Sequence, residues 1–169
     1  MCCVRVHLNL GVYETDVATK VATVDVNPKI RGGVNRMGRK DVSVERSRIR
    51  TKGAPAAIGP YSQAIMVGDT LYCSGQIAID PATGHMISDG LEAEAEQVLN
   101  NLRALLHAAD LEMEHVVQCR VYLTDMNDYG QVNEIYAQYF GEDAPAREAV
   151  QVAALPRGAR VEISCTAVR

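Results

Sequence analysis

The C-terminal stretch, residues 144–169, most constrains the fold, because apolar and polar residues alternate in it twice. Residues 147–153 predict one strand, residues 155–158 (Leu-Pro-Arg-Gly) predict a turn, and residues 160–168 predict a second strand. One face of the second strand is apolar and consists of Val161, Ile163, Cys165 and Ala167. We therefore expect these two strands to pair as a hairpin within the core of a sheet.

Two charged residues interrupt this apolar pattern. Arg147 stands at the start of the first strand, and Glu162 lies inside the second. A guanidinium presents a planar fork that binds a carboxylate through two parallel hydrogen bonds. A carboxylate can position or deprotonate a water molecule. These residue types leave two alternatives open: an Arg–Glu ion pair that closes the edge of the sheet, or a binding site for a small acid.

Composition excludes several classes of protein. The chain has 169 residues, enough for one domain with a sizeable core, and no run approaches the roughly 20 apolar residues of a membrane span. Its five cysteines include no C-x-x-C pair, and its four histidines have no recognisable metal-ligand spacing. We therefore predict a cytoplasmic protein without a metal or a disulfide framework, in which Cys73, Cys119 and Cys165 pack as small apolar residues.

The net charge of −4 conceals an asymmetry along the chain. Residues 1–50 hold ten Lys and Arg against five Asp and Glu, a net charge of +5. Residues 51–169 hold seven against sixteen, a net charge of −9. The acidic part offers no basic patch to follow a phosphate backbone, so neither nucleic acid nor a membrane is an expected partner.

Residues 1–36 are an N-terminal extension, and residues 37–169 are the predicted domain. Short apolar runs at 4–10 and 21–26 are compatible with strands, while residues 31–37 resemble a basic, flexible link. The extension lacks the features of a signal or transit peptide. Three alternatives remain: a disordered tail, a small addition to the sheet, or translation begun upstream of a true start at Met37. We favour the first and the third.

The middle of the chain predicts strands and loops, then helices. Residues 42–51 predict a polar strand near an edge. A loop with two prolines and two glycines follows at 53–63, and its stiffness would hold Tyr61 in place, either for a ligand or as a core aromatic. Residues 64–74 predict a hairpin around Gly68-Asp69. Ser74 and Gly75 end it with a hydroxyl and a bare backbone that a ligand can approach.

Apolar residues at helical spacing predict an amphipathic helix from about residue 90 to residue 109. We expect Asp89 to cap this helix, and Glu92, Glu94 and Glu96 to face solvent. Residues 116–124 predict a strand with one face made of Val117, Cys119, Val121 and Leu123. A second helix is expected to begin at residue 127 or 128 and end at Phe140, with Asn133 beside its apolar stripe.

This order of elements predicts an α+β fold, in which two helices pack on one face of a mixed β-sheet. Several strands carry apolar residues on both faces, for example Val116 and Tyr122 on one side and Val117 and Val121 on the other. An apolar sheet face without helices must meet another subunit. We therefore expect an oligomer whose clefts lie between chains.

The chain resembles the RidA (YjgF/YER057c/UK114) family of reactive-intermediate deaminases from about Ile49 to the C-terminus. The matching runs are 54–64 (APAAIGPYSQA), 74–77 (SGQI), 132–136 (VNEIY), 145–147 (PAR), 152–156 (VAALP) and 161–163 (VEI). Several long matches in the correct order make the resemblance specific, and the first 36 or so residues fall outside it.

The resemblance implies a chorismate-mutase-like fold, a homotrimer with clefts between subunits, and no cofactor or metal. It implies hydrolysis of 2-imino or enamine acids, such as 2-iminobutanoate and 2-iminopropanoate, to 2-oxo acids and ammonia. By the same resemblance, Arg147 would bind the substrate carboxylate and Glu162 would hold the attacking water. The remaining residues that would line and orient the pocket are Tyr61, Ser74, Gly75 and Asn133.

The chain departs from the family pattern at Glu148, because the residue after the motif arginine is usually small. On a regular strand Glu148 points away from Arg147, whereas an irregular strand would let the two pair and weaken the clamp. An alternative function is a non-catalytic trimer that binds a small carboxylate or acts as a chaperone. Endoribonuclease activity, which is known among relatives, fits poorly with the acidic domain.

Overall fold

The computed structural model describes residues 22–26 and 45–169. Strand β7, Val161–Val168, lies near the middle of a seven-stranded sheet with the order β1-β2-β3-β4-β7-β5-β6. The other strands are β1 (Ala22–Val26), β2 (Arg46–Thr51), β3 (Ala64–Val67), β4 (Thr70–Cys73), β5 (Val116–Leu123) and β6 (Ala146–Gln151). The predicted alternation of β7 is confirmed, since Val161, Ile163, Cys165 and Ala167 are at most 2% exposed.

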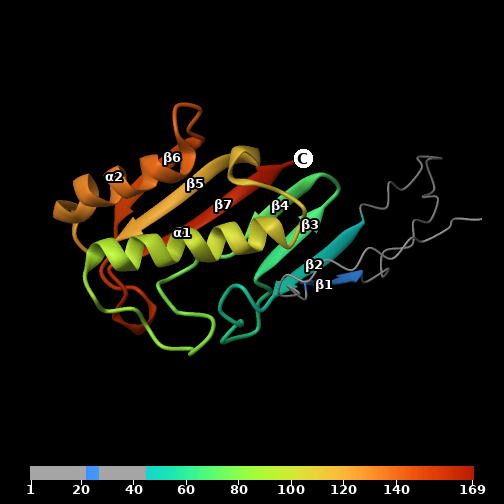
Figure 1. Cartoon of the computed structure of the whole chain (residues 1–169), viewed down its shortest axis with the longest axis horizontal. Coiled ribbons are helices and arrows are strands. Elements are labelled where there is room, and N and C mark those ends of the chain that lie inside the picture. The colour runs from blue at the N-terminus through green and yellow to red at the C-terminus, as the bar shows by residue number, and fades with distance from the viewer. Residues whose placement is uncertain (1–21, 27–44) are drawn as a thin grey trace, which may run out of the picture.

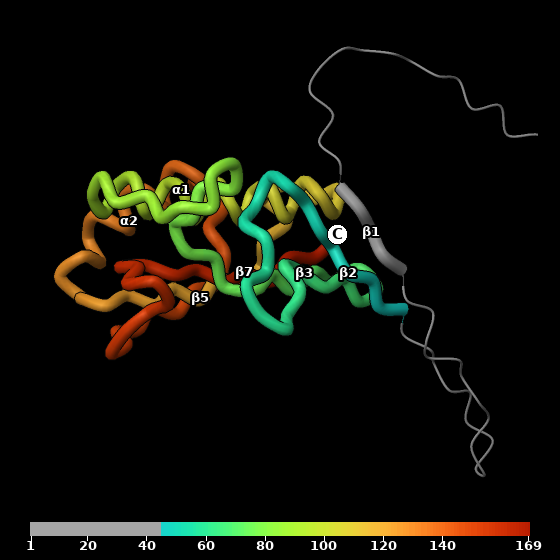
Figure 2. Tube along the Cα trace, turned by 90° about the horizontal axis from the view of Figure 1, so that it is seen from below, coloured from blue at the N-terminus to red at the C-terminus, as the bar shows by residue number. Residues whose placement is uncertain are grey.

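Two helices, α1 (Leu91–His107) and α2 (Tyr129–Phe140), cover one face of this sheet (Figures 1 and 2). The apolar stripe of α1 is buried as predicted, and Val98, Leu99, Leu102 and Leu106 are each 0% exposed. Burying each such leucine contributes about 1.5–3 kcal/mol, so the stripe is a main reason why α1 packs on the sheet. The α+β architecture predicted from the sequence, with both helices on one side, is confirmed.

The predicted hairpin between the two C-terminal strands is wrong. Strand β6 pairs in parallel with β5, and β7 pairs with β5 and β4, so β5 lies between them. The chain leaves β5, passes through α2 and returns as β6, which is the crossover that a parallel pair requires. Alternation indicates which residues form strands, but it does not determine which strands become neighbours.

Three smaller expectations also need correction. Val117 is 48% exposed, because a bulge between Val116 and Gln118 changes the phase of β5 and removes Val117 from the buried face. Gly90, with φ of 114°, is the N-cap of α1, and no side chain caps that terminus. Glu94 is only 7% exposed, and its carboxylate accepts a hydrogen bond from the backbone N–H of Arg160 at 3.0 Å.

The cysteines of the described part, Cys73, Cys119 and Cys165, are free and buried, as predicted. Burial raises the pKa of the Cys119 thiol to about 12, because the thiolate would lose its hydration in the core. A thiol of this kind is a poor nucleophile and packs as a small apolar side chain.

Strand β1 pairs antiparallel with β2, so residues 22–26 of the N-terminal extension add to the sheet, which is the alternative we had not favoured. The predictions for residues 1–21 and 27–44 lie outside the described residues. Within the described ranges, no helix combines the length and the apolar character needed to cross a membrane.

Candidate active site

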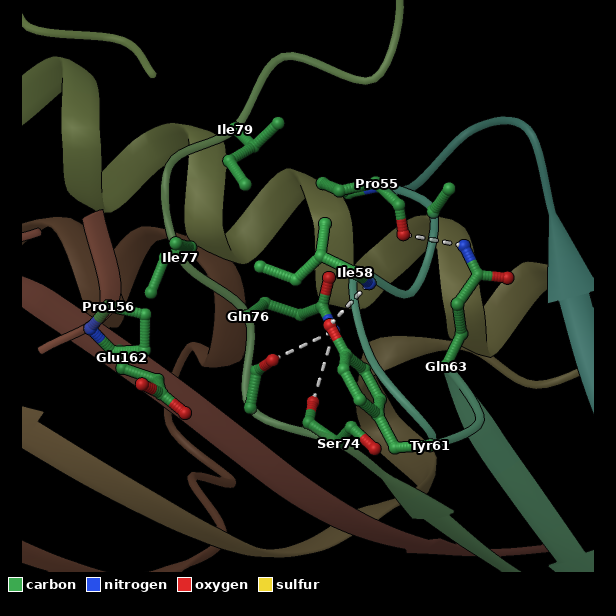
Figure 3. Close-up of a pocket in the computed structure, with 12 residues that line it drawn as sticks. Pro55, Ile58, Tyr61, Gln63, Ser74, Gln76, Ile77, Ile79, Pro156 and Glu162 are labelled. Atoms are coloured by element: carbon green, nitrogen blue, oxygen red, sulfur yellow. Dashed lines mark hydrogen bonds between the residues drawn. The ribbon is translucent and has the colours of Figure 1, made fainter. Parts of the chain in front are cut away.

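A cavity of about 350 Å³ opens where the 55–63 loop meets the end of β4 and the start of β7 (Figure 3). Four residues that the sequence singled out line it: Tyr61, Ser74, Gly75 and Glu162. Its apolar wall consists of Pro55, Ala56, Ile58, Ile77, Ile79 and Pro156. The cavity therefore combines hydroxyl groups and one carboxylate with an apolar lining, which is typical of a site for a small organic molecule.

The loop that carries Tyr61 is fastened to β2 by the side chain of Gln63. Its amide nitrogen donates to the carbonyls of Thr51, Ala54 and Pro55 at 3.0, 3.1 and 2.8 Å, and its amide oxygen accepts from the Thr51 N–H at 2.9 Å. Because Gln63 is only 6% exposed, these bonds are sheltered from water. Gln63 was not among the predicted site residues, although a glutamine directly before the buried start of β3 is visible in the sequence.

The hydroxyls of Tyr61 and Ser74 differ in the hydrogen bond that each can still make to a ligand. The Ser74 hydroxyl donates to the carbonyl of Ser62 at 2.7 Å, so its oxygen can only accept a further hydrogen bond. The Tyr61 hydroxyl accepts from the Ile58 N–H at 3.3 Å, and its own hydrogen remains available. Together they offer one acceptor and one donor to a molecule in the cavity.

Gly75 lies against Glu162 because the segment after β4 pairs with β7. The Gln76 N–H donates to the carbonyl of Ile163 at 2.9 Å, and the Ile163 N–H donates back at 3.1 Å. The Gln76 side chain also donates to the carbonyls of Ser74 and Gly75, both at 3.1 Å (Figure 3). A Cβ atom at position 75 would overlap the Glu162 carboxylate, with its Cδ only 2.8 Å away. Only glycine leaves room for this carboxylate.

Glu162 is half-buried, and no described residue donates a hydrogen bond or forms an ion pair with its carboxylate. Burial raises the pKa of Glu162 above its ordinary value, because desolvation disfavours the charged form. A carboxylate with a raised pKa is a stronger base than an exposed one. Its chemistry therefore suits proton transfer to and from a water molecule.

Arg147 does not reach this cavity in the same chain. On β6 it stands opposite Cys119 of β5, whose side chain is buried on the helix-covered face, whereas Glu162 stands opposite Tyr122 on the open face. The Arg147 guanidinium donates to the Tyr129 hydroxyl at 2.9 Å and lies over the ring of Tyr136, 4.6 Å from its centroid. Within one chain, the two charges therefore lie on opposite faces of the sheet.

The one remaining predicted site residue also lies away from the cavity. Asn133 is exposed on α2 and does not line it. Glu148 points to the face opposite Arg147, as a regular strand requires, and its carboxylate pairs with Arg120 at 2.9 Å. The pairing of Glu148 with Arg147 that an irregular strand would have allowed is therefore absent. Within the described part, no three His, Cys, Asp or Glu residues are grouped to hold a metal ion.

The family model described as Endoribonuclease L-PSP matches residues 51–169. A mouse (Mus musculus) protein named 2-iminobutanoate/2-iminopropanoate deaminase is 54% identical over 127 residues, covering 75% of this chain and 94% of the mouse protein. RidA from the Antarctic bacterium Psychrobacter is 46% identical, with a TM-score of 0.69, over 71% of this chain and 97% of RidA. E. coli TdcF with bound serine is 40% identical, with a TM-score of 0.69, over 72% of this chain and 98% of TdcF. By sequence and by fold, the chain belongs to the RidA family of imine and enamine deaminases, to which the Endoribonuclease L-PSP model also refers.

Proposed function

We propose that this protein is a 2-iminobutanoate/2-iminopropanoate deaminase, which hydrolyses reactive 2-imino acids and their enamines to 2-oxo acids and ammonia. The observation that carries the proposal is the unpaired, half-buried Glu162 carboxylate in a cavity that also holds Tyr61 and Ser74. The name and the 54% identity of the mouse relative point to the same reaction.

The reaction adds water across the carbon–nitrogen bond and then expels nitrogen. The Glu162 carboxylate takes a proton from water as the water oxygen bonds to the imine carbon, which gives a carbinolamine. The imine nitrogen is protonated when water adds, so the carbinolamine is neutral. The protonated Glu162 then gives its proton to nitrogen, the C–N bond breaks, and ammonia leaves as the hydroxyl loses its proton to solvent and the C=O bond forms. Arg147 binds the substrate carboxylate, while Tyr61, Ser74 and the backbone of Gly75 orient the reacting carbon. General acid–base catalysis of this kind is worth roughly 10²–10⁴-fold.

Because Arg147 and Glu162 lie on opposite faces of one sheet, we propose a homotrimer in which neighbouring chains share each site. The open face of the sheet supports an interface, since Tyr72, Val150 and Val168 are 52%, 46% and 38% exposed on it. Exposed apolar side chains that cluster on a sheet face are typical of a surface that another subunit covers. In this assembly Asn133 of α2 and Arg147 would enter a neighbour's cavity.

Mixing two inactive variants tests both the function and the shared site. Chains carrying Arg147→Ala and chains carrying Glu162→Gln should each fail to clear 2-iminobutanoate supplied by a threonine dehydratase. Unfolded, mixed in equal amounts and refolded together, they should recover activity. In a trimer with shared sites, about one quarter of the sites then receive both original residues. The readout is formation of the semicarbazone from the imine, which declines as the deaminase removes it.

Two outcomes would contradict the proposal. If the mixture stays inactive although a wild-type sample refolds to full activity under the same conditions, the two residues do not act across an interface. If the wild-type protein does not clear the imine, the function itself is wrong. Sedimentation of the mixture as a trimer is the control that shows the chains assembled.

The pH dependence of activity should report the raised pKa of Glu162. The base must be ionised, so activity should fall as pH drops through a value above the ~4.3 of an ordinary glutamate. Glu162→Gln should remove this acidic limb together with most of the activity. A wild-type rate that stays constant down to pH 4, after subtraction of uncatalysed hydrolysis, would exclude Glu162 as the base.

Glu162→Gln also has a predictable effect on the stability of the fold. A carboxyl whose pKa is raised by folding contributes stability below its unfolded-state pKa, and this contribution is lost as pH rises through the folded-state pKa. At neutral pH the ionised Glu162 therefore destabilises the fold. Glu162→Gln should melt at the same temperature as the wild type or higher, so its loss of activity would not come from unfolding.

A second candidate is a trimer that binds a small carboxylate without turning it over. It is favoured by TdcF, whose structure holds a bound serine. This candidate predicts that 2-oxobutanoate raises the melting temperature while the imine persists. The net charge of −9 over residues 51–169 argues against RNA as the substrate, despite the family model's description as Endoribonuclease L-PSP.

We place the active domain at residues 37–169 and the activity in the cytoplasm. The family match begins at residue 51, and the free thiols of Cys73, Cys119 and Cys165 suit a reducing compartment.

A further inference from the structure

The Arg147 guanidinium is held between two tyrosines of α2. It donates from Nη2 to the Tyr129 hydroxyl at 2.9 Å, and its Cζ atom lies 5.5 Å from the Tyr129 ring centroid and 4.6 Å from that of Tyr136. Both rings lie within the distance at which a cation interacts with an aromatic face. Tyr136 therefore stacks on the guanidinium, and Tyr129 both stacks on it and accepts a hydrogen bond from it.

No described carboxylate neutralises this guanidinium. Arg120 pairs with Glu148 and Arg160 pairs with Asp128, but the polar contact of Arg147 is with a neutral phenol. An arginine has five N–H donors, so most of the fork remains available for a planar anion. A long side chain that is already held in one orientation loses less conformational entropy when it binds such an anion.

We propose that Tyr129 is a positioning residue for the carboxylate clamp: its hydroxyl fixes the guanidinium of Arg147 in the orientation that receives the substrate carboxylate. This inference rests on the role given to Arg147 in the proposed function. Tyr136 stacks on the guanidinium, but its buried hydroxyl faces the Cys119 thiol and makes no hydrogen bond to Arg147. Stacking limits the tilt of the guanidinium, whereas the hydrogen bond to the Tyr129 hydroxyl limits its rotation within the plane of the fork.

Tyr129→Phe isolates this contribution, because it removes one oxygen and keeps both stacking rings. We expect the dissociation constant of 2-oxobutanoate, measured by titration calorimetry, to rise about tenfold, which is the range for losing one hydrogen bond to a charged group. The KM for the imine should rise by a similar factor, while kcat stays within about twofold. In an Arg147→Ala background, Tyr129→Phe should change neither quantity further.

Tyr139→Phe is a matched control on the same helix. The Tyr139 hydroxyl donates to Asn100 at 3.2 Å, and Arg103 lies 5.5 Å from its ring centroid, so this tyrosine has the same kinds of contact, but with an arginine other than Arg147. We expect it to leave affinity and KM unchanged. The melting temperature of each variant separates loss of positioning from loss of folding.

The inference is overturned if Tyr129→Phe binds 2-oxobutanoate as tightly as the wild type, or if it weakens binding equally in the Arg147→Ala background. It is also overturned if Tyr139→Phe has the same effect. Failure of the proposed function would be distinct: the wild type would bind 2-oxobutanoate, and Tyr129→Phe would weaken that binding, although neither protein consumed the imine. That result would support the positioning role within a carboxylate-binding protein.

Discussion

Arg147→Ala is expected to lower kcat/KM for 2-iminobutanoate by roughly 30-fold or more. The guanidinium stacks on two tyrosine rings and donates a hydrogen bond to Tyr129, and no described carboxylate pairs with it. Truncating one partner of a desolvated, hydrogen-bonded charge pair costs about 2–5 kcal/mol, which corresponds to roughly 30- to 5,000-fold in binding. Arg147→Lys should recover only a small part of the loss, because an ammonium lacks the planar fork.

Arg103→Ala is the control for this prediction. Arg103 also lies over a tyrosine ring, at 5.5 Å from the Tyr139 centroid, but it is exposed on α1 and hydrogen-bonds to Asn100. Its removal should leave kcat/KM within about twofold, since exposed charges contribute little. If Arg147→Ala clears the imine as fast as the wild type, the substrate carboxylate is bound elsewhere and the proposed mechanism is wrong.

Gly75→Ala should reduce activity by about a hundredfold while changing the melting temperature little. The added methyl group would overlap the Glu162 carboxylate, whose Cδ lies 2.8 Å from the Cβ position. The atoms that must move are the far end of a flexible side chain, so the fold can adapt by swinging the carboxylate away. The enzyme would then lose most of a general-base contribution of roughly 10²–10⁴-fold.

A double-mutant cycle separates this explanation from a general disturbance of the pocket. If Gly75→Ala acts by displacing Glu162, it should have no further effect on kcat in a Glu162→Gln background. Equal losses in both backgrounds would mean that the methyl group blocks the substrate directly. A fall in melting temperature of more than about 5 °C would mean instead that the segment paired with β7 had been disrupted.

Local patterns predicted the elements of this fold well. The period of about 3.6 residues located α1, and alternation located β3, β4, β5 and β7, because burial of one face is decided within each element. Which strands pair with one another was not predictable from these local patterns. The two C-terminal strands looked like a hairpin, yet β5 separates them. The bulge that exposes Val117 and the burial of Glu94 likewise depend on partners distant in the sequence.

The candidate site was also predictable in part, because several of its residues stand out from their near neighbours in the sequence. Tyr61, Ser74, Gly75 and Glu162 were singled out from the sequence, and the structure brings all four to one cavity. Their selection drew on rigid loop chemistry, on a bare glycine and on a charge within an apolar strand, all of which are visible in the sequence. The roles given to them remain predictions. Gln63, which fastens the loop, was missed, because its hydrogen bonds reach back to Thr51, Ala54 and Pro55.

The sequence by itself determined the helices, the strands, the acidic character and the residues with unusual chemistry, since each of these depends on a residue and its near neighbours. Only the tertiary structure decided that Arg147 and Glu162 face opposite sides of the sheet. Side chains alternate along every strand, so the face on which a residue lies depends on the register with its partner strand and on where the helices pack. That arrangement is set by long-range contacts, and it is the reason why we propose a site that two chains share.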